Sequence, residues 1–123
     1  MQKKEIAIAF LKSAAAGDVR NAYEKYVAAN FIHHNQYFKG DREALMHAME
    51  DAHKATPNKT LTVKKVLEDG NHVMTFSEII RSNHNSATIA VIHIFRIEND
   101  KIVELWDVGQ EVLKDSPNKN GIF

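Results

Sequence analysis

The chain has 123 residues, of which 44% are hydrophobic and 26% are charged. This length suits one domain that buries a core without disulfide or metal staples, and the composition is that of an ordinary globular protein. Sixteen basic residues balance sixteen acidic ones, so the chain has no net field to hold nucleic acid or an anionic membrane. We therefore expect neither nucleic acid nor a membrane as a partner.

The chain contains no cysteine. This excludes a disulfide framework, a thiolate nucleophile and a thiolate metal site. A protein without disulfides suits a reducing compartment, so we expect it in the cytoplasm. The N-terminal apolar run at 6–11 is shorter than the roughly 7–15 residues of a signal peptide, and it predicts an ordinary helix.

Three helices are predicted in the first half of the chain. Apolar residues at three- and four-residue spacing from Ile6 to Ala14 predict a helix that ends at Gly17. Asp18 is placed to cap a second helix through about Ala28, and Asp41 begins a third. Between the second and third helices, the segment 30–40 predicts a short strand or an extended corner.

Four strands are predicted in the second half, at 60–68, 72–81, 87–97 and 101–110, with a polar loop at 82–86. Helices followed by antiparallel strands predict an α+β domain, in which a curved antiparallel sheet wraps around the N-terminal helices as a cone. The open mouth of such a cone is a natural pocket.

The last hairpin decides which side chains face this pocket. A two-residue turn at 99–100 places His93 opposite Trp106, whereas a three-residue loop at 98–100 places His93 opposite Leu105 and Val91 opposite Asp107. We adopt the three-residue loop. It puts one set of side chains on the pocket surface, namely Val91, His93, Phe95, Val103, Leu105 and Asp107. The opposite surface then carries Ile92, Ile94, Ile102, Trp106 and Val108.

The strand at 72–81 presents two alternating sides. One side is apolar apart from a single acid and consists of Met74, Phe76, Glu78 and Ile80. If this side lines the pocket, Glu78 is a second carboxylate there. Otherwise Glu78 lies at the rim with Arg81, which is the interpretation we favour.

Four segments, "NFIHHN", "GDREAL", "IFRIENDKIVELWDVGQ" and "SPNKNGIF", resemble landmarks of the SnoaL-like polyketide cyclase branch of the nuclear transport factor 2-like superfamily. The resemblance extends from about Ala14 to Phe123 and implies that residues 1–123 form a single SnoaL-like domain. It also implies a cone-shaped barrel and a homodimer formed through the sheet. The family's usual Glu-Asn-Gly turn suits a three-residue loop, which is why we adopt that register.

The resemblance also implies a site. By position, Asp107 is the acid of the Trp-Asp pair and His34 is the corner histidine before Asn35. In such cyclases an acid at this position is the general acid and base of an intramolecular aldol closure, without a metal or a cofactor. The resemblance therefore implies Asp107 and His34 as catalytic residues and no cofactor.

The residues around Asp107 give a separate argument. An acid walled by Val, Leu and Phe side chains is desolvated, which penalises its charged form and suits it to proton transfer near neutral pH. The alternative is a structural acid at a strand end, paired to a backbone amide or to Arg96.

The histidines leave alternatives open. His33 and His34 alternate along an extended chain, so only one of them can face the cavity. His34 either hydrogen-bonds a substrate or Asp107, or holds backbone groups at the corner. His93 is a ligand-contacting group or, more ordinarily, a satisfied interior histidine. Seven histidines raise the question of a metal, but no His-x-His or His-x-x-x-His pair is present, so we expect none.

A small apolar or aromatic ligand is the expected partner of the pocket. The side chains predicted to contact it are His93, Phe76, Phe95, Glu78, Leu105 and Tyr37. Trp106 is assigned to core or dimer packing. The segment 118–123 either folds back as a lid or is a frayed end.

These residues favour a cofactor-independent cyclase, isomerase or lyase that applies acid–base chemistry to a small carbonyl compound. The alternative is a non-catalytic small-molecule binding protein of the same fold. Hydrolysis is the third interpretation, because it needs several polar groups around one water.

Overall fold

The computed structural model describes residues 1–81 and 87–123. In chain order the elements are α1 (Lys3–Ala15), α2 (Val19–Tyr26), β1 (Val27–His33), α3 (Arg42–Ala55), β2 (Thr60–Asp69), β3 (His72–Ile80), β4 (Ile89–Glu98) and β5 (Lys101–Glu111). The α+β class is thereby confirmed. The polar loop predicted at 82–86 lies outside the described residues.

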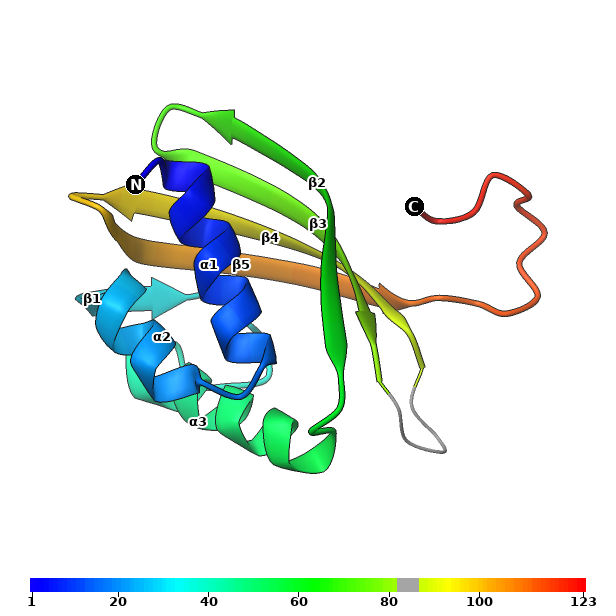
Figure 1. The fold of residues 1–123 in the computed structure, drawn as a ribbon, viewed down its shortest axis with the longest axis horizontal. Coiled ribbons are helices and arrows are strands. Elements are labelled where there is room, and N and C mark those ends of the chain that lie inside the picture. The colour runs from blue at the N-terminus through cyan, green and yellow to red at the C-terminus, as the bar shows by residue number, and fades with distance from the viewer. Residues whose placement is uncertain (82–86) are drawn as a thin grey trace.

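The strands form one open sheet in the order β1-β5-β4-β3-β2, and the helices lie on its concave face (Figure 1). β2 to β5 are antiparallel neighbours, but β1 pairs with β5 in parallel. The antiparallel sheet predicted from the second half of the chain is confirmed for β2 to β5, and β1 adds a parallel strand that was not predicted. A parallel pair needs a long connection, and here the whole of α3 and β2–β4 lies between the two strands.

A side chain caps one of the three helices at its start. Asp41 caps α3, because its Oδ1 accepts a hydrogen bond from the backbone N–H of Ala44 at 2.8 Å. Asp18 precedes α2 as predicted but does not cap it. Its Oδ1 accepts from Asn21 Nδ2 instead, at 3.0 Å. α2 ends at Tyr26, earlier than predicted, because β1 begins at the next residue.

The core lies between the helices and the concave face of the sheet. Phe10 of α1 is its centre: its ring lies 5.4 Å from that of Tyr23 and 6.2 Å from that of Phe95, both in edge-on geometry. Aromatic pairs at such distances add to the stabilisation that burial provides. The inward residues of β4 and β5 are buried as predicted, including Val91, His93, Phe95, Val103 and Leu105.

The β4–β5 hairpin differs from both registers considered. Asn99 and Asp100 both have positive φ, at 50° and 60°, and form a two-residue turn, so the three-residue loop was wrong. Beyond the turn the register shifts at a bulge, and His93 pairs with Asp107. The bulge leaves Ile102 and Val103 both buried, so the predicted outward position of Ile102 was also wrong. The other side chains of β4 and β5 lie on the faces predicted for them. The observed register differs from the predicted one by two residues, and a shift of two residues leaves each side chain on the same face of the sheet.

β3 presents the opposite face to the one considered for the pocket. Val73, Thr75 and Ser77 are its buried residues. Phe76 and Glu78 alternate with them and lie on the outer face, so the pocket positions considered for both were wrong. Two hydroxyl side chains thus enter the core while apolar neighbours face outward, which inverts the usual pattern.

The C-terminal segment folds back along the outer face of the sheet. The Phe123 ring lies 5.4 Å from that of Phe76, and Lys64 Nζ lies 5.6 Å from the centre of the Phe123 ring. The segment therefore contacts the side opposite the helices instead of covering the mouth of the cone. Among the residues described, no helix is long and apolar enough to cross a membrane.

Candidate functional site

A row of polar side chains crosses three neighbouring strands on the concave face. Thr75 of β3 pairs with His93 of β4, and His93 pairs with Asp107 of β5. Directly opposite residues of neighbouring strands point to the same face. The sheet therefore places the carboxyl group of Asp107 beside the imidazole of His93.

Asn35 orients Asp107. Its Nδ2 donates a hydrogen bond to Asp107 Oδ2 at 3.0 Å. The same amide is fixed at its other end, because Asn35 Oδ1 accepts from the backbone N–H of Tyr37 at 3.0 Å. Sequence reasoning did not assign Asn35 to the site, although "NFIHHN" was singled out. The segment does contain Asn35, but only its two histidines were considered as site residues.

Asp107 opens onto a groove of about 600 Å³ at the end of β5. That volume lies within the usual range for small-molecule sites. One wall is the corner after β1, and the other is formed by the ends of β4 and β5; the lining residues are His34, Asn35, Gln36, Tyr37, Ile89, Val91, Asp107, Val108, Gly109, Gln110 and Glu111. Of the residues predicted to contact a ligand, Tyr37 lies here.

His34 lies at the rim of this groove and faces away from Asp107. Its Nε2 lies 2.6 Å from Glu104 Oε2, and its ring stacks on Trp106 at 4.9 Å and 6°. The bond from His34 holds the pKa of Glu104 below its usual value, assisted by Arg96. The partner of His34 is thus Glu104 instead of Asp107. His33 is the inward member of the pair, with Nε2 2.6 Å from the Lys39 carbonyl oxygen.

Arg96 was one of two partners considered for a purely structural Asp107, the other being a backbone amide, and it does not pair with Asp107. Its guanidinium binds Glu104 at 2.9 Å and Glu98 at 2.8 Å. Glu78 likewise has its own partner, because Lys64 Nζ lies 3.6 Å from its carboxylate. Arg81, which was considered as that partner, donates to the Ala87 carbonyl oxygen instead.

His93 is buried, with 7% of its surface exposed. Its Nδ1 has no hydrogen-bond partner within residues 1–81 and 87–123, so a fully satisfied interior histidine is not what the structure shows. Burial lowers the pKa of His93 to about 4, and the neighbouring Asp107 charge opposes this shift. At neutral pH the imidazole is therefore neutral.

A second hollow, of about 120 Å³, lies on the other side of His93. It is lined by residues of α1, α3, β2, β3 and β4 and by the turn before β2, namely Leu11, Ala14, Ala15, Met49, Ala52, Lys59, Leu61, Ile79 and His93. Phe95 and Leu105, predicted to contact a ligand, line neither hollow and are almost wholly enclosed by the core.

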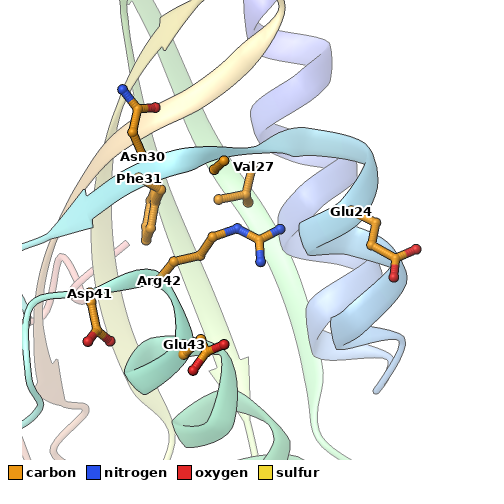
Figure 2. Close-up of a pocket in the computed structure, with 8 residues that line it drawn as sticks. Glu24, Val27, Asn30, Phe31, Asp41, Arg42 and Glu43 are labelled. Carbon is orange, nitrogen blue, oxygen red and sulfur yellow. The ribbon is translucent and has the colours of Figure 1, made fainter.

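A third hollow, of about 690 Å³, lies between α2, β1 and the start of α3 (Figure 2). Arg42 points across it beside Phe31 and Val27. The guanidinium is held from one side, because Nη2 donates to the Tyr23 carbonyl oxygen at 3.1 Å and its carbon lies 5.4 Å from the Tyr23 ring centre. None of the predicted site residues lines this hollow. We assign Arg42 a structural role, because its contacts with Tyr23 hold the start of α3 against α2.

No three His, Asp or Glu side chains in the part of the chain that is described are grouped as metal ligands. The site therefore consists of Asp107, Asn35 and His93, with a groove on one side and a small cavity on the other.

Comparison with known proteins agrees with this architecture. The SnoaL-like domain family matches residues 7–105. The chain belongs to this family. The matched segment of the SnoaL-like domain includes Asn35 and His93 and ends just before Asp107. A search of curated proteins finds no match.

Solved structures of similar proteins share the fold. AclR, a proposed hydroxylase from Streptomyces galilaeus, is 16% identical with a TM-score of 0.75, and the match covers 88% of each chain. IdmH, a proposed polyketide cyclase from Streptomyces antibioticus, is 17% identical with a TM-score of 0.74, covering 89% of this chain and 93% of its own. A protein of unknown function from Cytophaga hutchinsonii, described as NTF2-like, is 21% identical with a TM-score of 0.71, covering 89% and 91%. At these low identities the comparison shows that the SnoaL-like domain has the same NTF2-like fold as these proteins. It does not show that they share an activity.

Proposed function

We propose that this SnoaL-like protein binds a small, largely apolar carbonyl compound in the groove at Asp107 and moves a proton on it. The reaction class is that of a cofactor-independent cyclase, isomerase or lyase. One observation carries the proposal: Asp107 lies in the wall of the groove with Oδ2 fixed by Asn35. A carboxyl group held in this way is positioned for acid–base chemistry.

The proposed step begins with the Asp107 carboxylate. It removes a proton from the carbon next to the substrate carbonyl, which leaves an enolate. In a cyclase the enolate carbon then forms a bond to a second carbonyl carbon of the same molecule, and the resulting alkoxide takes the proton back from Asp107. In an isomerase the proton returns to a different carbon. Such proton transfer contributes about 10²–10⁴-fold to a rate.

Two neighbours support this role. Asn35 fixes Oδ2, and Oδ1 is the oxygen proposed to act on the substrate. His93 is neutral because of its burial, so it does not pair with the carboxylate as a cation. The structural neighbour IdmH is named as a proposed polyketide cyclase, and that chemistry is compatible with the step proposed here.

A deuterium-exchange assay tests the proposal without a known substrate. A panel of small ketones and 1,3-diketones is incubated with the protein in heavy water, and NMR follows exchange of the hydrogens next to the carbonyl. We expect faster exchange with the natural sequence and a loss of at least about 100-fold with Asp107→Asn. Asp51→Asn, which changes an exposed acid of α3, is the matched control.

The same assay separates the second candidate, a binding protein without catalysis. A panel compound that binds in the groove, seen by chemical-shift changes, but exchanges equally with the natural sequence and with Asp107→Asn would exclude the acid–base role. Mass spectrometry of any small molecule that co-purifies then identifies the ligand class.

We also propose a homodimer formed through the outer face of the sheet.

A further inference from the structure

The 120 Å³ cavity contains an amine without a partner. Lys59 lies in the turn between α3 and β2, directly before the first residue of β2. Its Nζ is buried, and no group in the described part of the chain hydrogen-bonds to it. The residue as a whole is half-buried, but its amine end has neither solvent contact nor a counter-charge among the described residues, which is unusual for lysine.

The surroundings of Lys59 are apolar. Apart from Lys59 and His93, every residue that lines the cavity carries an aliphatic or thioether side chain, and no acid is among the described lining residues. Burial lowers the pKa of Lys59, because the charged ammonium form is penalised in such surroundings. In a larger fraction of the molecules Lys59 is therefore an uncharged amine, which is the nucleophilic form.

His93 supplies a second orphan group at the same cavity. It is almost fully buried, lines the cavity, and has an Nδ1 without a partner among the residues described. Because burial keeps the imidazole neutral at neutral pH, it does not repel a cation and it can donate or accept one hydrogen bond. An amine and a neutral imidazole thus share one small apolar hollow.

We infer that this cavity binds a small aldehyde or ketone and that Lys59 Nζ forms an imine with its carbonyl carbon. The free amine adds to the carbonyl carbon and gives a carbinolamine. The carbonyl oxygen then leaves as water, together with the two hydrogens of the amine, and a C=N bond remains. Hydrolysis with one water restores both partners, so no other reactant is needed.

The size of the cavity limits the substrate class. Its 120 Å³ corresponds to about four water molecules at roughly 30 Å³ each. This is room for an aldehyde or ketone with a short aliphatic chain, whose carbons contact Leu11, Met49 and Ile79. A carboxylate of the same size is disfavoured, because its charge would be buried beside a neutral imidazole and a free amine, without a counter-charge.

Reductive trapping tests the inference on the full chain. The protein is treated at pH 7 with a limiting amount of propanal and sodium cyanoborohydride, which converts an imine into a stable propyl-lysine, and peptide mass spectrometry measures the rate at each lysine. We expect Lys59 to be modified several-fold faster than exposed Lys54, because its lowered pKa leaves more free amine and because the cavity holds the aldehyde beside Nζ.

Two variants complete the test. Lys59→Arg should remove the fast phase from the total label, whereas Lys54→Arg, the matched control, should leave it. Ala15→Leu fills the cavity with a helix-compatible side chain and should reduce the rate ratio to near one while Lys59 remains present. Equal labelling of Lys59 and Lys54, or a ratio unchanged by Ala15→Leu, would overturn the inference. The labelling does not depend on exchange at Asp107, so each proposal can fail separately.

Discussion

Burial of His93 makes the stability of the fold depend on pH. The pKa of His93 is lowered to about 4 in the folded state, against an ordinary value near 6.5. Between these values the unfolded chain binds the proton and the folded chain does not, so stability is fully present above about pH 6.5 and is lost as the pH falls. Integrated over the window, the loss is up to about 3 kcal/mol. Urea denaturation at pH 7 and at pH 5 measures the part of this loss that falls above pH 5, about 2 kcal/mol.

The matched variant for this measurement is His93→Phe, which keeps an aromatic ring beside Phe95, whose centre lies 5.8 Å away, but does not titrate. We expect its stability to fall less than that of the natural sequence between pH 7 and pH 5. Equal losses in the two proteins would assign the pH dependence to other groups. The acids with lowered pKa values, among them Asp41 and Glu104, titrate mainly below this interval.

Asn35 is expected to matter through Asp107. Asn35→Ala removes the Nδ2 that donates to Asp107 Oδ2, so the carboxyl group can rotate away from the productive orientation. We expect the Asp107-dependent exchange rate to fall about tenfold, with a loss of about 1 kcal/mol of stability from the missing hydrogen bond. Asn30→Ala, at an exposed position of β1, should change neither quantity. An unaltered exchange rate in Asn35→Ala would remove Asn35 from the site.

At the scale of single residues, the sequence indicated Asp107 and His93 but neither Asn35 nor Lys59. The Trp-Asp pair marks Asp107 in the chain, whereas Asn35 reaches it from 72 residues away. Lys59 was not singled out, since a lysine in a polar turn is ordinarily solvated. Its burial comes from packing of α1 and α3 against the sheet, which no local pattern in the chain expresses.

The connection between α1 and α2 depends on Gly17. This residue has φ +95°, and a Cβ added there would lie 2.4 Å from Nε2 of His53 on α3. Gly17→Ala therefore combines backbone strain, which costs about 1–2 kcal/mol, with a displacement of His53. We expect a total loss of stability of about 2–4 kcal/mol, measured by urea denaturation.

Gly70 provides the control for this substitution. It also has positive φ, at +58°, but nothing lies within 4 Å of an added Cβ. Gly70→Ala should therefore show the backbone strain alone, about 1–2 kcal/mol. Removing the obstructing ring in Gly17→Ala/His53→Ala should recover part of the loss. Equal effects of the two glycine substitutions would show that His53 moves without cost.

At the scale of elements, alternation predicted most strand faces but not how the strands align. The inward set of β4 and β5 was right, while the turn type was wrong, and a bulge restored the faces. The bulge places two successive side chains, Ile102 and Val103, in the core. An alternating pattern of apolar and polar residues does not indicate where such a bulge lies. The position of the additional residue depends on the space available in the core.

The architecture of the whole molecule was largely predictable, because the segregation of helical and strand periodicities is a property of the chain itself. The parallel pairing of β1 with β5 was not predictable in this way. It joins residues about 75 positions apart, as in the pair Val27 and Ile102, and local patterns carry no information on such contacts. The resemblance to SnoaL-like proteins supported the cone-like arrangement of helices and sheet but did not supply this pairing.

The outer face of the sheet has an apolar centre that supports the proposed homodimer. Ile92 occupies this centre, since its neighbours across the strands are Phe76 and Val108, and 36% of its surface is exposed. Val108 is 74% exposed. Apolar side chains grouped on one face of a sheet favour association with a second such face.

Ile92→Glu tests the homodimer. A carboxylate at the centre of two apposed sheets would be buried without a partner in both copies, which costs about 3 kcal/mol or more. We therefore expect the dissociation constant to rise at least about 100-fold, measured by sedimentation equilibrium. The monomer should remain folded, because the position is exposed to solvent there. Leu113→Glu alters another exposed apolar side chain, outside the sheet, and should leave association unchanged. A natural sequence that sediments as a monomer, or equal association of both variants, would contradict dimerisation through this face.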